Sequence, residues 1–142
     1  MIVYFDSSVL VKRYVTEEKV EEVDLLWSQS DEAACSVIGF AEVLSAIARR
    51  VREGAIAPSE RDLLIPRFRS DWDSLVHVAV SEEVNEIAAP VLATYPLRAM
   101  DAIHLASAVS LRGEADREVL FASADARLAA AARSEGLRVF PE

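Results

Sequence analysis

Two acidic residues lie within three positions of the end of apolar segments that are typical of short strands. Asp6 comes after residues 2–5 in "MIVYFDSSVL", and Asp125 follows residues 119–122 in "VLFASADARL". In an open α/β sheet, functional sites form beyond the carboxyl ends of the strands, where the connections diverge. An aspartate at such a position also serves as the N-cap of the next helix. From the sequence, each of the two residues is therefore either a helix cap or part of a functional site.

Asp101 is a third candidate acid, and it lies at the start of a segment with a helical pattern, "DAIHLASAVSL". When the residues are placed at about 100° steps around a helix, apolar side chains cover nearly the whole circumference, which predicts a buried helix. These side chains are Met100, Ile103, Leu105, Val109 and Leu111. A buried carboxylate needs a partner, because an unpaired buried charge is very costly. A cap, a salt bridge or a metal ion would each supply that partner.

Glu42 is a fourth candidate, on weaker grounds. On a helical wheel it points away from the apolar stripe of its helix, which is typical of a solvated residue. The stripe consists of Phe40, Val43, Leu44 and Ile47. Glu42 lies in the first turns of a helix that follows a predicted strand at 33–37, and this puts it on the carboxyl side of the sheet. His104 lies one turn after Asp101, and we interpret it as a buried histidine bonded to a neighbour rather than as a catalytic base.

Strand and helix patterns alternate from one end of the chain to the other. Short segments rich in β-branched and aromatic residues predict strands at 2–5, 33–37, 75–80, 119–122 and 137–140. Apolar residues at helical spacing predict helices at 9–14, 17–29, 40–51, 58–68, 82–95, 99–112 and 124–134. We expect Pro66 to kink one of these helices and Gly113 to end another. The pattern favours an α/β fold: one domain over residues 1–142, with a mostly parallel sheet of about five short strands and helices on both faces.

Composition supports one globular domain, because 52% of the 142 residues are hydrophobic and 27% are charged. The start of the chain has no basic region ahead of its apolar stretch, so we expect no signal peptide there. Uncharged apolar stretches are too short to span a bilayer. A single cysteine, Cys35, excludes an internal disulfide, suits a cytoplasmic location and is interpreted as a buried core residue.

The net charge of −9 argues against binding to nucleic acid through a broad basic face. It either aids solubility or includes a cluster of acids that binds a cation. Four carboxylates in one cleft would repel each other without such a cation. Mg²⁺ or Mn²⁺ would relieve this repulsion, since both are hard cations that prefer oxygen ligands.

Four segments, in this order, resemble the PIN-domain ribonucleases and more narrowly the VapC-type toxins of toxin–antitoxin pairs. They read "IVYFDSSVLVKRY", "FAEVLSAIARR", "PLRAMDAIHLASA" and "FASADARLAAAARSEGLRVF". The resemblance runs from residue 2 to about residue 140. It implies that the four acids Asp6, Glu42, Asp101 and Asp125 form a catalytic site for Mg²⁺, or alternatively Mn²⁺. It also implies that Ser7 orients a ligand water or the Asp6 carboxylate, and that Ser123 has a similar place beside Asp125.

The function implied by this resemblance is metal-dependent endonucleolytic cleavage of RNA, leaving a 5′-phosphate and a 3′-hydroxyl. Members of this toxin group are held by a small antitoxin whose tail covers the acidic cleft, and they are commonly homodimers. Local basic residues near the acids, Lys12, Arg13 and Arg98, are expected to steer RNA to the cleft.

Two other functions remain open from the sequence. A catalytically inactive PIN-like binding module would be signalled by missing acids, and all four are present. A phosphatase of the haloacid-dehalogenase type also places an aspartate after its first strand, but it needs a second acid two residues later, where this chain has Ser8.

Overall fold

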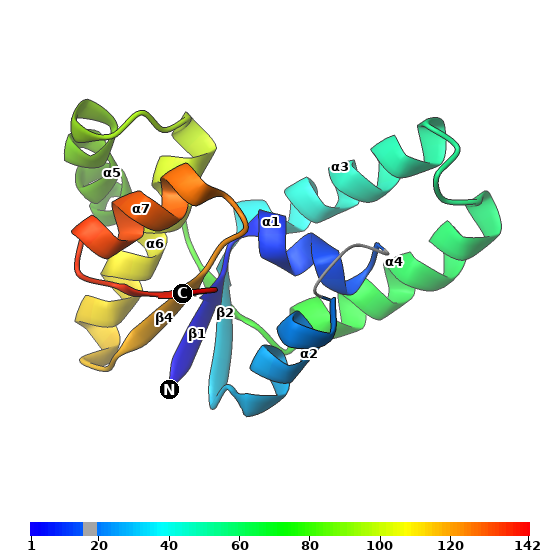
Figure 1. Ribbon diagram of the computed structural model, residues 1–142, viewed down its shortest axis with the longest axis horizontal. Coiled ribbons are helices and arrows are strands. Elements are labelled where there is room, and N and C mark those ends of the chain that lie inside the picture. The colour runs from blue at the N-terminus through cyan, green and yellow to red at the C-terminus, as the bar shows by residue number, and fades with distance from the viewer. Residues whose placement is uncertain (16–19) are drawn as a thin grey trace.

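The computed structural model describes residues 1–15 and 20–142. Within them lies a five-stranded, entirely parallel sheet with the order β3–β2–β1–β4–β5 (Figure 1). The strands are β1 (Ile2–Phe5), β2 (Glu32–Ser36), β3 (Val76–Val78), β4 (Val119–Ala122) and β5 (Arg138–Phe140). The predicted α/β fold with a parallel sheet is confirmed.

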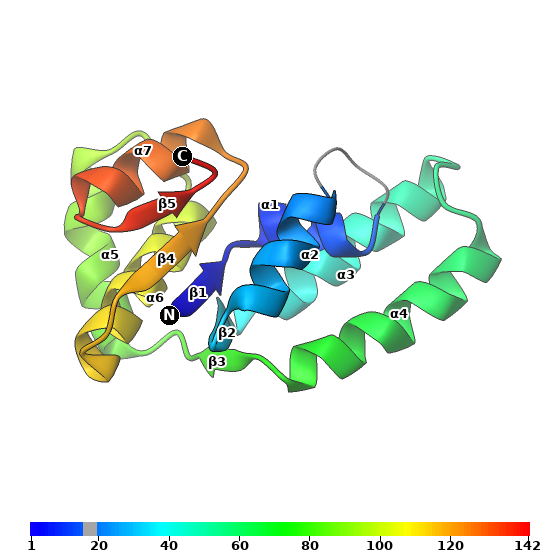
Figure 2. The same ribbon diagram turned by 60° about the horizontal axis from the view of Figure 1, so that its bottom comes forward.

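Helices cover both faces of the sheet (Figures 1 and 2). The described helices are α1 (Ser7–Leu10), α2 (Val20–Gln29), α3 (Ile38–Arg52), α4 (Pro58–Asp73), α5 (Glu82–Thr94), α6 (Ala99–Ala115) and α7 (Ala126–Ser134), and a 3₁₀ turn, η1 (Val11–Arg13), follows α1. Residues 17–19 of the helix predicted at 17–29 lie outside the described residues. Helices α3 and α4 form a long arm that extends away from the sheet (Figure 2).

The central strand β1 contributes to two separate hydrophobic cores, because successive strand residues face opposite sides of a sheet. Ile2 and Tyr4 pack with residues of α5, α6 and α7. Val3 and Phe5 pack on the other side, with residues of α1, α2, α3 and α4. All four residues of β1 are at most 1% exposed, so the strand is fixed from both faces.

Two predictions about α6 are wrong. The helix continues through Gly113 to Ala115 and ends at Asp116, whose φ of 49° is left-handed. The helix is also not buried all round, since Met100 is 51% exposed. Its buried face consists mainly of small residues, Ala102, Ala106, Ser107, Ala108 and Ser110, together with His104 and Leu105. Small side chains allow close packing of a helix on its neighbours, and a wheel that weights large apolar residues does not show this face.

The carboxyl edge of the sheet is where the chain diverges to both sides. Strand β1 lies between β2 and β4, so the connections after β1, β2 and β4 all begin at this edge. They lead into α1, α3 and α7, and α6 also begins there (Figure 1). Such a switch point is the usual place for a site in an open α/β sheet.

Candidate active site

Asp6 is both a helix cap and a buried acid. Its side chain is 2% exposed at the end of β1, where its backbone N–H donates to Ala122 O at 3.0 Å. Oδ1 accepts hydrogen bonds from Ser8 Oγ at 2.6 Å and from the N–H of Val9 at 3.0 Å. Oδ2 accepts from Ser123 Oγ at 2.6 Å. The cap and the candidate site are therefore compatible for this residue.

Burial raises the pKa of the Asp6 carboxyl above its ordinary value, while the hydrogen bonds from Ser123 and Ser8 oppose the rise. The positive charge of a protonated His104 would act in the same direction as the hydrogen bonds. A group in this position is costly to ionise, and such groups cluster at functional sites.

Glu42 ends a chain of hydrogen bonds that begins in the sheet. Its Oε1 lies 2.6 Å from Nε2 of His104, which is 2% exposed. Nδ1 of His104 lies 2.8 Å from the hydroxyl of Tyr4, and this hydroxyl accepts from the N–H of Ser36 at 3.0 Å. The prediction that His104 is a buried histidine bonded to a neighbour is confirmed, and the neighbour is one of the four candidate acids.

Cys35 is fully buried, as predicted. Its thiol lies close enough to two of the acids for their negative charges to affect its pKa. Burial raises the pKa of its thiol most, and the nearby negative charges of Asp6 and Glu42 raise that pKa further. The thiol is therefore an uncharged core group. Asp6 and Glu42 come from different elements, and the charges of both act on the same buried thiol.

Asp101 lies in the first turn of α6, and its side chain is half-buried rather than buried. Oδ2 accepts from the N–H of Arg98 at 3.3 Å, which caps the start of the helix. Because Asp101 itself remains in part exposed to solvent, it needs no buried partner. His104 follows Asp101 by one helical turn.

Asp125 caps α7 and is connected to Asp6 through Ser123. Oδ1 of Asp125 accepts from the N–H groups of Arg127 at 2.9 Å and Leu128 at 3.2 Å. Its own N–H donates to Ser123 Oγ at 3.1 Å, and the same Oγ donates to Asp6. Ser123 therefore holds the ends of β1 and β4 together.

The four candidate acids have the ligand chemistry that a hard divalent cation prefers. All four candidate acids offer carboxylate oxygens, which Mg²⁺ and Mn²⁺ prefer. In residues 1–15 and 20–142, no three side chains of His, Cys, Asp or Glu are grouped to hold a metal ion. Mg²⁺ does not require such a cage, because it usually keeps several waters and binds through one or two carboxylates together with substrate phosphates.

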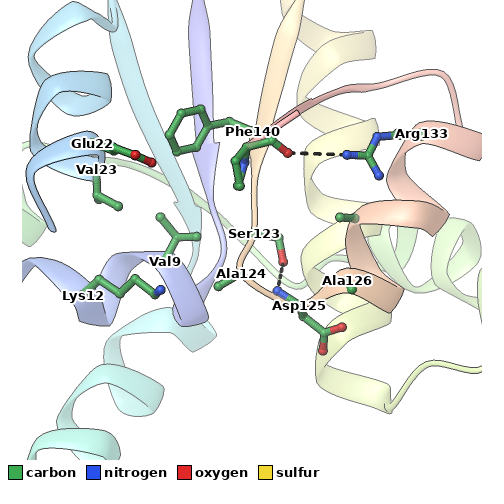
Figure 3. A pocket seen from close by; sticks show the side chains of 12 residues that line it. Val9, Lys12, Glu22, Val23, Ser123, Ala124, Asp125, Ala126, Arg133 and Phe140 are labelled. Carbon is green, nitrogen blue, oxygen red and sulfur yellow. Dashed lines mark hydrogen bonds between the residues drawn. The ribbon is translucent and has the colours of Figure 1, made fainter. Parts of the chain in front are cut away.

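Two of the cavities that border the segment formed by α1 and η1 lie beside candidate acids. One, of about 320 Å³, is lined by residues that include Val9, Lys12, Glu22, Ser123, Asp125 and Phe140 (Figure 3). The other, of about 480 Å³, is lined by Ser7, Ser8, Glu42 and Arg49 among others. The candidate acids Asp125 and Glu42 thus each border a hollow large enough for part of a ligand.

The three predicted RNA-steering residues differ in their surroundings. Lys12 lines the cavity beside Asp125 and has no ionic partner in the described part of the chain. Arg98 is exposed next to Asp101. Arg13 is 12% exposed, pairs with Asp24 at 2.9 Å and Asp71 at 3.6 Å, and lies over the Trp27 ring at 4.0 Å.

Sequence reasoning missed Ser8 and Tyr4. Ser8 holds the Asp6 carboxylate, whereas the side chain of Ser7 makes no hydrogen bond in the described residues and lines the cavity beside Glu42. The role of Ser7 toward a ligand water stays a prediction. Tyr4 could have been found from one signal: a fully buried strand residue with a hydroxyl requires a hydrogen-bond partner.

Comparison with known proteins places this geometry in a family. The family model described as "PIN domain" matches residues 3–134. The chain belongs to the PIN domain family. Ribonucleases VapC45 and VapC49, both from Mycobacterium tuberculosis, are each 32% identical to it over 145 residues, covering 99% of this chain and 95% of the relative. Within the PIN family the chain is therefore of the VapC type.

Solved structures share the fold at lower sequence identity. FitAcB from Neisseria gonorrhoeae matches with a TM-score of 0.67 and 18% identity, over 99% of this chain and 96% of that one. VapBC-1 from nontypeable Haemophilus influenzae matches with a TM-score of 0.67 and 14% identity, over 98% and 96% of the two chains. A chain of a toxin–antitoxin complex from Klebsiella pneumoniae matches with a TM-score of 0.58 and 19% identity, over 83% of each chain. None of the described helices is long and apolar enough to cross a membrane.

Proposed function

We propose that this PIN-domain protein is a metal-dependent endoribonuclease and the toxin of a toxin–antitoxin pair. The observation that carries the proposal is Asp6, a buried carboxylate held by two serine hydroxyls at the switch point of the sheet. Asparagine or serine would cap α1 as well as aspartate does. An aspartate at this position is therefore explained if its carboxylate has a chemical role. The relatives named ribonuclease VapC support RNA cleavage as that role.

The chain's own residues have distinct tasks in this reaction. A bound Mg²⁺ or Mn²⁺ supplies Lewis acidity toward the phosphodiester and a water of lowered pKa. Asp6 and Asp101 are the proposed principal ligands, and Glu42 and Asp125 complete the acidic edge. Ser123 and Ser8 fix the Asp6 carboxylate, so that it needs no rearrangement to bind. The expected products carry a 5′-phosphate and a 3′-hydroxyl.

Substrate contact is proposed first for the two basic residues that remain available. Lys12 lies on the wall of the cavity beside Asp125, where an RNA phosphate would approach the acids (Figure 3). Arg98 is exposed beside Asp101 at the start of α6. A role for Arg13 in contacting RNA stays a prediction, because its guanidinium already pairs with Asp24 and Asp71.

A small antitoxin is the proposed protein partner. The solved toxin–antitoxin complex and the VapBC-1 structure support this role by their similarity. The net charge of −9 favours a basic partner segment, which would also neutralise the acidic edge. A homodimer and a cytoplasmic location belong to the same proposal.

The experiment is RNA cleavage by the purified chain with Mg²⁺ or Mn²⁺ and with a chelator. The variants Asp6→Asn and Asp101→Asn remove one candidate ligand each, with little change in shape. Glu114→Gln changes the charge equally on an exposed residue near the other end of α6, and serves as the matched control.

The proposal predicts cleavage by the wild type and by Glu114→Gln, at least about 100-fold slower cleavage by the two aspartate variants, and none with chelator. Cleavage that survives chelation, or that is equal in all four proteins, would contradict it. Metal binding without cleavage of any RNA would instead favour an inactive binding module.

A further inference from the structure

His104 is a polar residue at a position in the core that packing alone would fill with an apolar side chain. It is 2% exposed on α6, yet both of its ring nitrogens have polar partners, Tyr4 from β1 and Glu42 from α3. A leucine at this position would fill the same core at less cost, since buried polar groups must be satisfied. The ring therefore joins three elements through polar contacts.

Two groups with fixed roles, the Ser36 N–H and the Glu42 carboxylate, set the directions of these hydrogen bonds. The backbone N–H of Ser36 can only donate, so the Tyr4 oxygen accepts there at 3.0 Å. The ionised Glu42 carboxylate only accepts, so Nε2 of His104 carries a proton, and in the neutral ring Nδ1 then accepts from the Tyr4 hydroxyl at 2.8 Å. A neutral imidazole that accepts at Nδ1 carries its proton at Nε2. This Nε2–H donates to Glu42 Oε1 at 2.6 Å.

Two of these elements, β1 and α6, lead into or carry two of the other candidate acids. Tyr4 is two residues before Asp6 on the chain that leaves β1, and His104 is three residues after Asp101 on α6. A shift of α3 against α6 or β1 would therefore break this chain of bonds. The ring fixes the Glu42 carboxylate relative to both Asp6 and Asp101.

We propose that His104 and Tyr4 are positioning residues for Glu42, which hold Oε1 and leave Oε2 directed to the metal. This inference rests on the proposed function of the acidic edge. Oε2 of Glu42 makes no hydrogen bond within the described part of the chain. Carboxylates that bind metals are usually hydrogen-bonded in turn, and removing that partner lowers metal affinity.

Two substitutions of similar polarity separate positioning from packing. His104→Asn keeps an acceptor where Nδ1 meets Tyr4 but cannot reach Glu42. His104→Gln places an amide N–H where Nε2–H meets Glu42. We expect the Mn²⁺ affinity, measured by calorimetry on the free protein, to fall about tenfold or more in His104→Asn. Affinity in His104→Gln should stay within about threefold of the wild type.

The tautomer of His104 tests the proposed hydrogen-bond directions without any metal. The chain has two histidines, so a His77→Gln variant leaves His104 alone in the ¹H–¹⁵N spectrum. The expected spectrum shows a neutral ring with the proton on Nε2 and an unprotonated Nδ1. A proton on Nδ1 of the neutral ring would overturn the inference.

The two proposals fail in different ways. Wild-type affinity for Mn²⁺ in a folded His104→Asn protein would overturn the positioning role and leave the proposed function intact. A wild type that neither binds Mn²⁺ nor cleaves RNA would overturn the proposed function, and with it the role of His104. Equal losses in His104→Asn and His104→Gln, with both folded, would assign His104 to packing.

Discussion

A carboxylate that is 2% exposed normally weakens a fold, because its charged form loses hydration. Asp6 offsets this loss with hydrogen bonds from Ser8, Ser123 and the N–H of Val9. Its pKa nevertheless stays raised by burial, so ionised Asp6 remains a net cost to stability. At the scale of single residues, the molecule thus keeps a destabilising group at the centre of its candidate site.

Replacing Asp6 by Asn should therefore stabilise the protein while abolishing RNA cleavage. Asn can accept from the N–H of Val9 and donate to Ser123 Oγ, and it carries no charge to desolvate. We expect the free energy of unfolding at pH 7.5 to rise by about 1 kcal/mol, measured by urea denaturation. A large loss of stability at this pH would contradict the account of Asp6.

The pH dependence of this gain has a definite sign. Because the pKa of Asp6 is higher in the folded than in the unfolded protein, the unfolded state loses its proton first as pH rises. The cost of Asp6 therefore grows from its ordinary pKa of 3.8 up to its folded pKa and persists above it. The difference in stability between Asp6→Asn and the wild type should vanish below about pH 4. A difference that grows as pH falls would contradict this assignment.

At the scale of elements, three helices begin with a candidate acid. Asp6 caps α1, Asp101 lies in the first turn of α6, and Asp125 caps α7. The positive end of a helix dipole favours a carboxylate at each of these places. The sequence could not decide between a cap and a site for Asp6 and Asp125, because each residue has both roles. In the structure each is a helix cap whose carboxylate also lies at the candidate site.

Two variants at Asp125 separate these roles. Asp125→Asn keeps a side-chain oxygen for the N–H groups of Arg127 and Leu128, so stability should change little while RNA cleavage falls. Asp125→Ala removes the cap as well and should cost about 1 kcal/mol of unfolding free energy. Thermal denaturation and a cleavage assay on both variants test this. Equal stability of the two variants would show that the cap contributes little.

The start of α3 depends on close packing between Gly39 and Cys35. A Cβ at position 39 would clash with Cys35 Sγ, and Gly39 lies one turn before Glu42. Gly39→Ala should therefore shift α3, cost about 2 kcal/mol of stability and slow RNA cleavage.

A second substitution tests the cause. In a Cys35→Ala background the sulfur is absent, so adding Gly39→Ala should cost much less than it does in the wild type. Denaturation curves for the two single variants and the double variant measure the coupling. Additive costs would show that the sulfur is not the obstacle.

Elements were predictable where the signal is local. The strand at 2–5 and the strand at 119–122 coincide with β1 and β4, because a short run of β-branched and aromatic residues is distinctive. Gly113 did not end α6, because packing beyond it, where Ala115 lies against the core, outweighs the weak preference against glycine. The bond between His104 and Glu42 was beyond local reasoning, since it joins residues 62 positions apart.

At the scale of the whole molecule, acidic groups lie at both edges of the sheet, but in different surroundings. At the amino edge, Asp31 pairs with the N-terminus of Met1 and with Arg117, which also pairs with Glu32. At the carboxyl edge, the partners of the Asp6 carboxylate are two hydroxyls and one backbone N–H, and that of Glu42 is His104. Of these two edges, we therefore expect the carboxyl edge to bind the divalent cation.

Paramagnetic broadening by Mn²⁺ tests this claim most directly. Substoichiometric Mn²⁺ is added to ¹⁵N-labelled wild-type protein, and the loss of each backbone amide signal is recorded. We predict that signals near Asp6, Asp101 and Asp125 disappear first, while those near Asp31 and Glu32 persist, and that Asp6→Asn removes the selectivity. Broadening that begins at Asp31 and Glu32, or that spreads evenly over the protein, would contradict a metal site at the carboxyl edge.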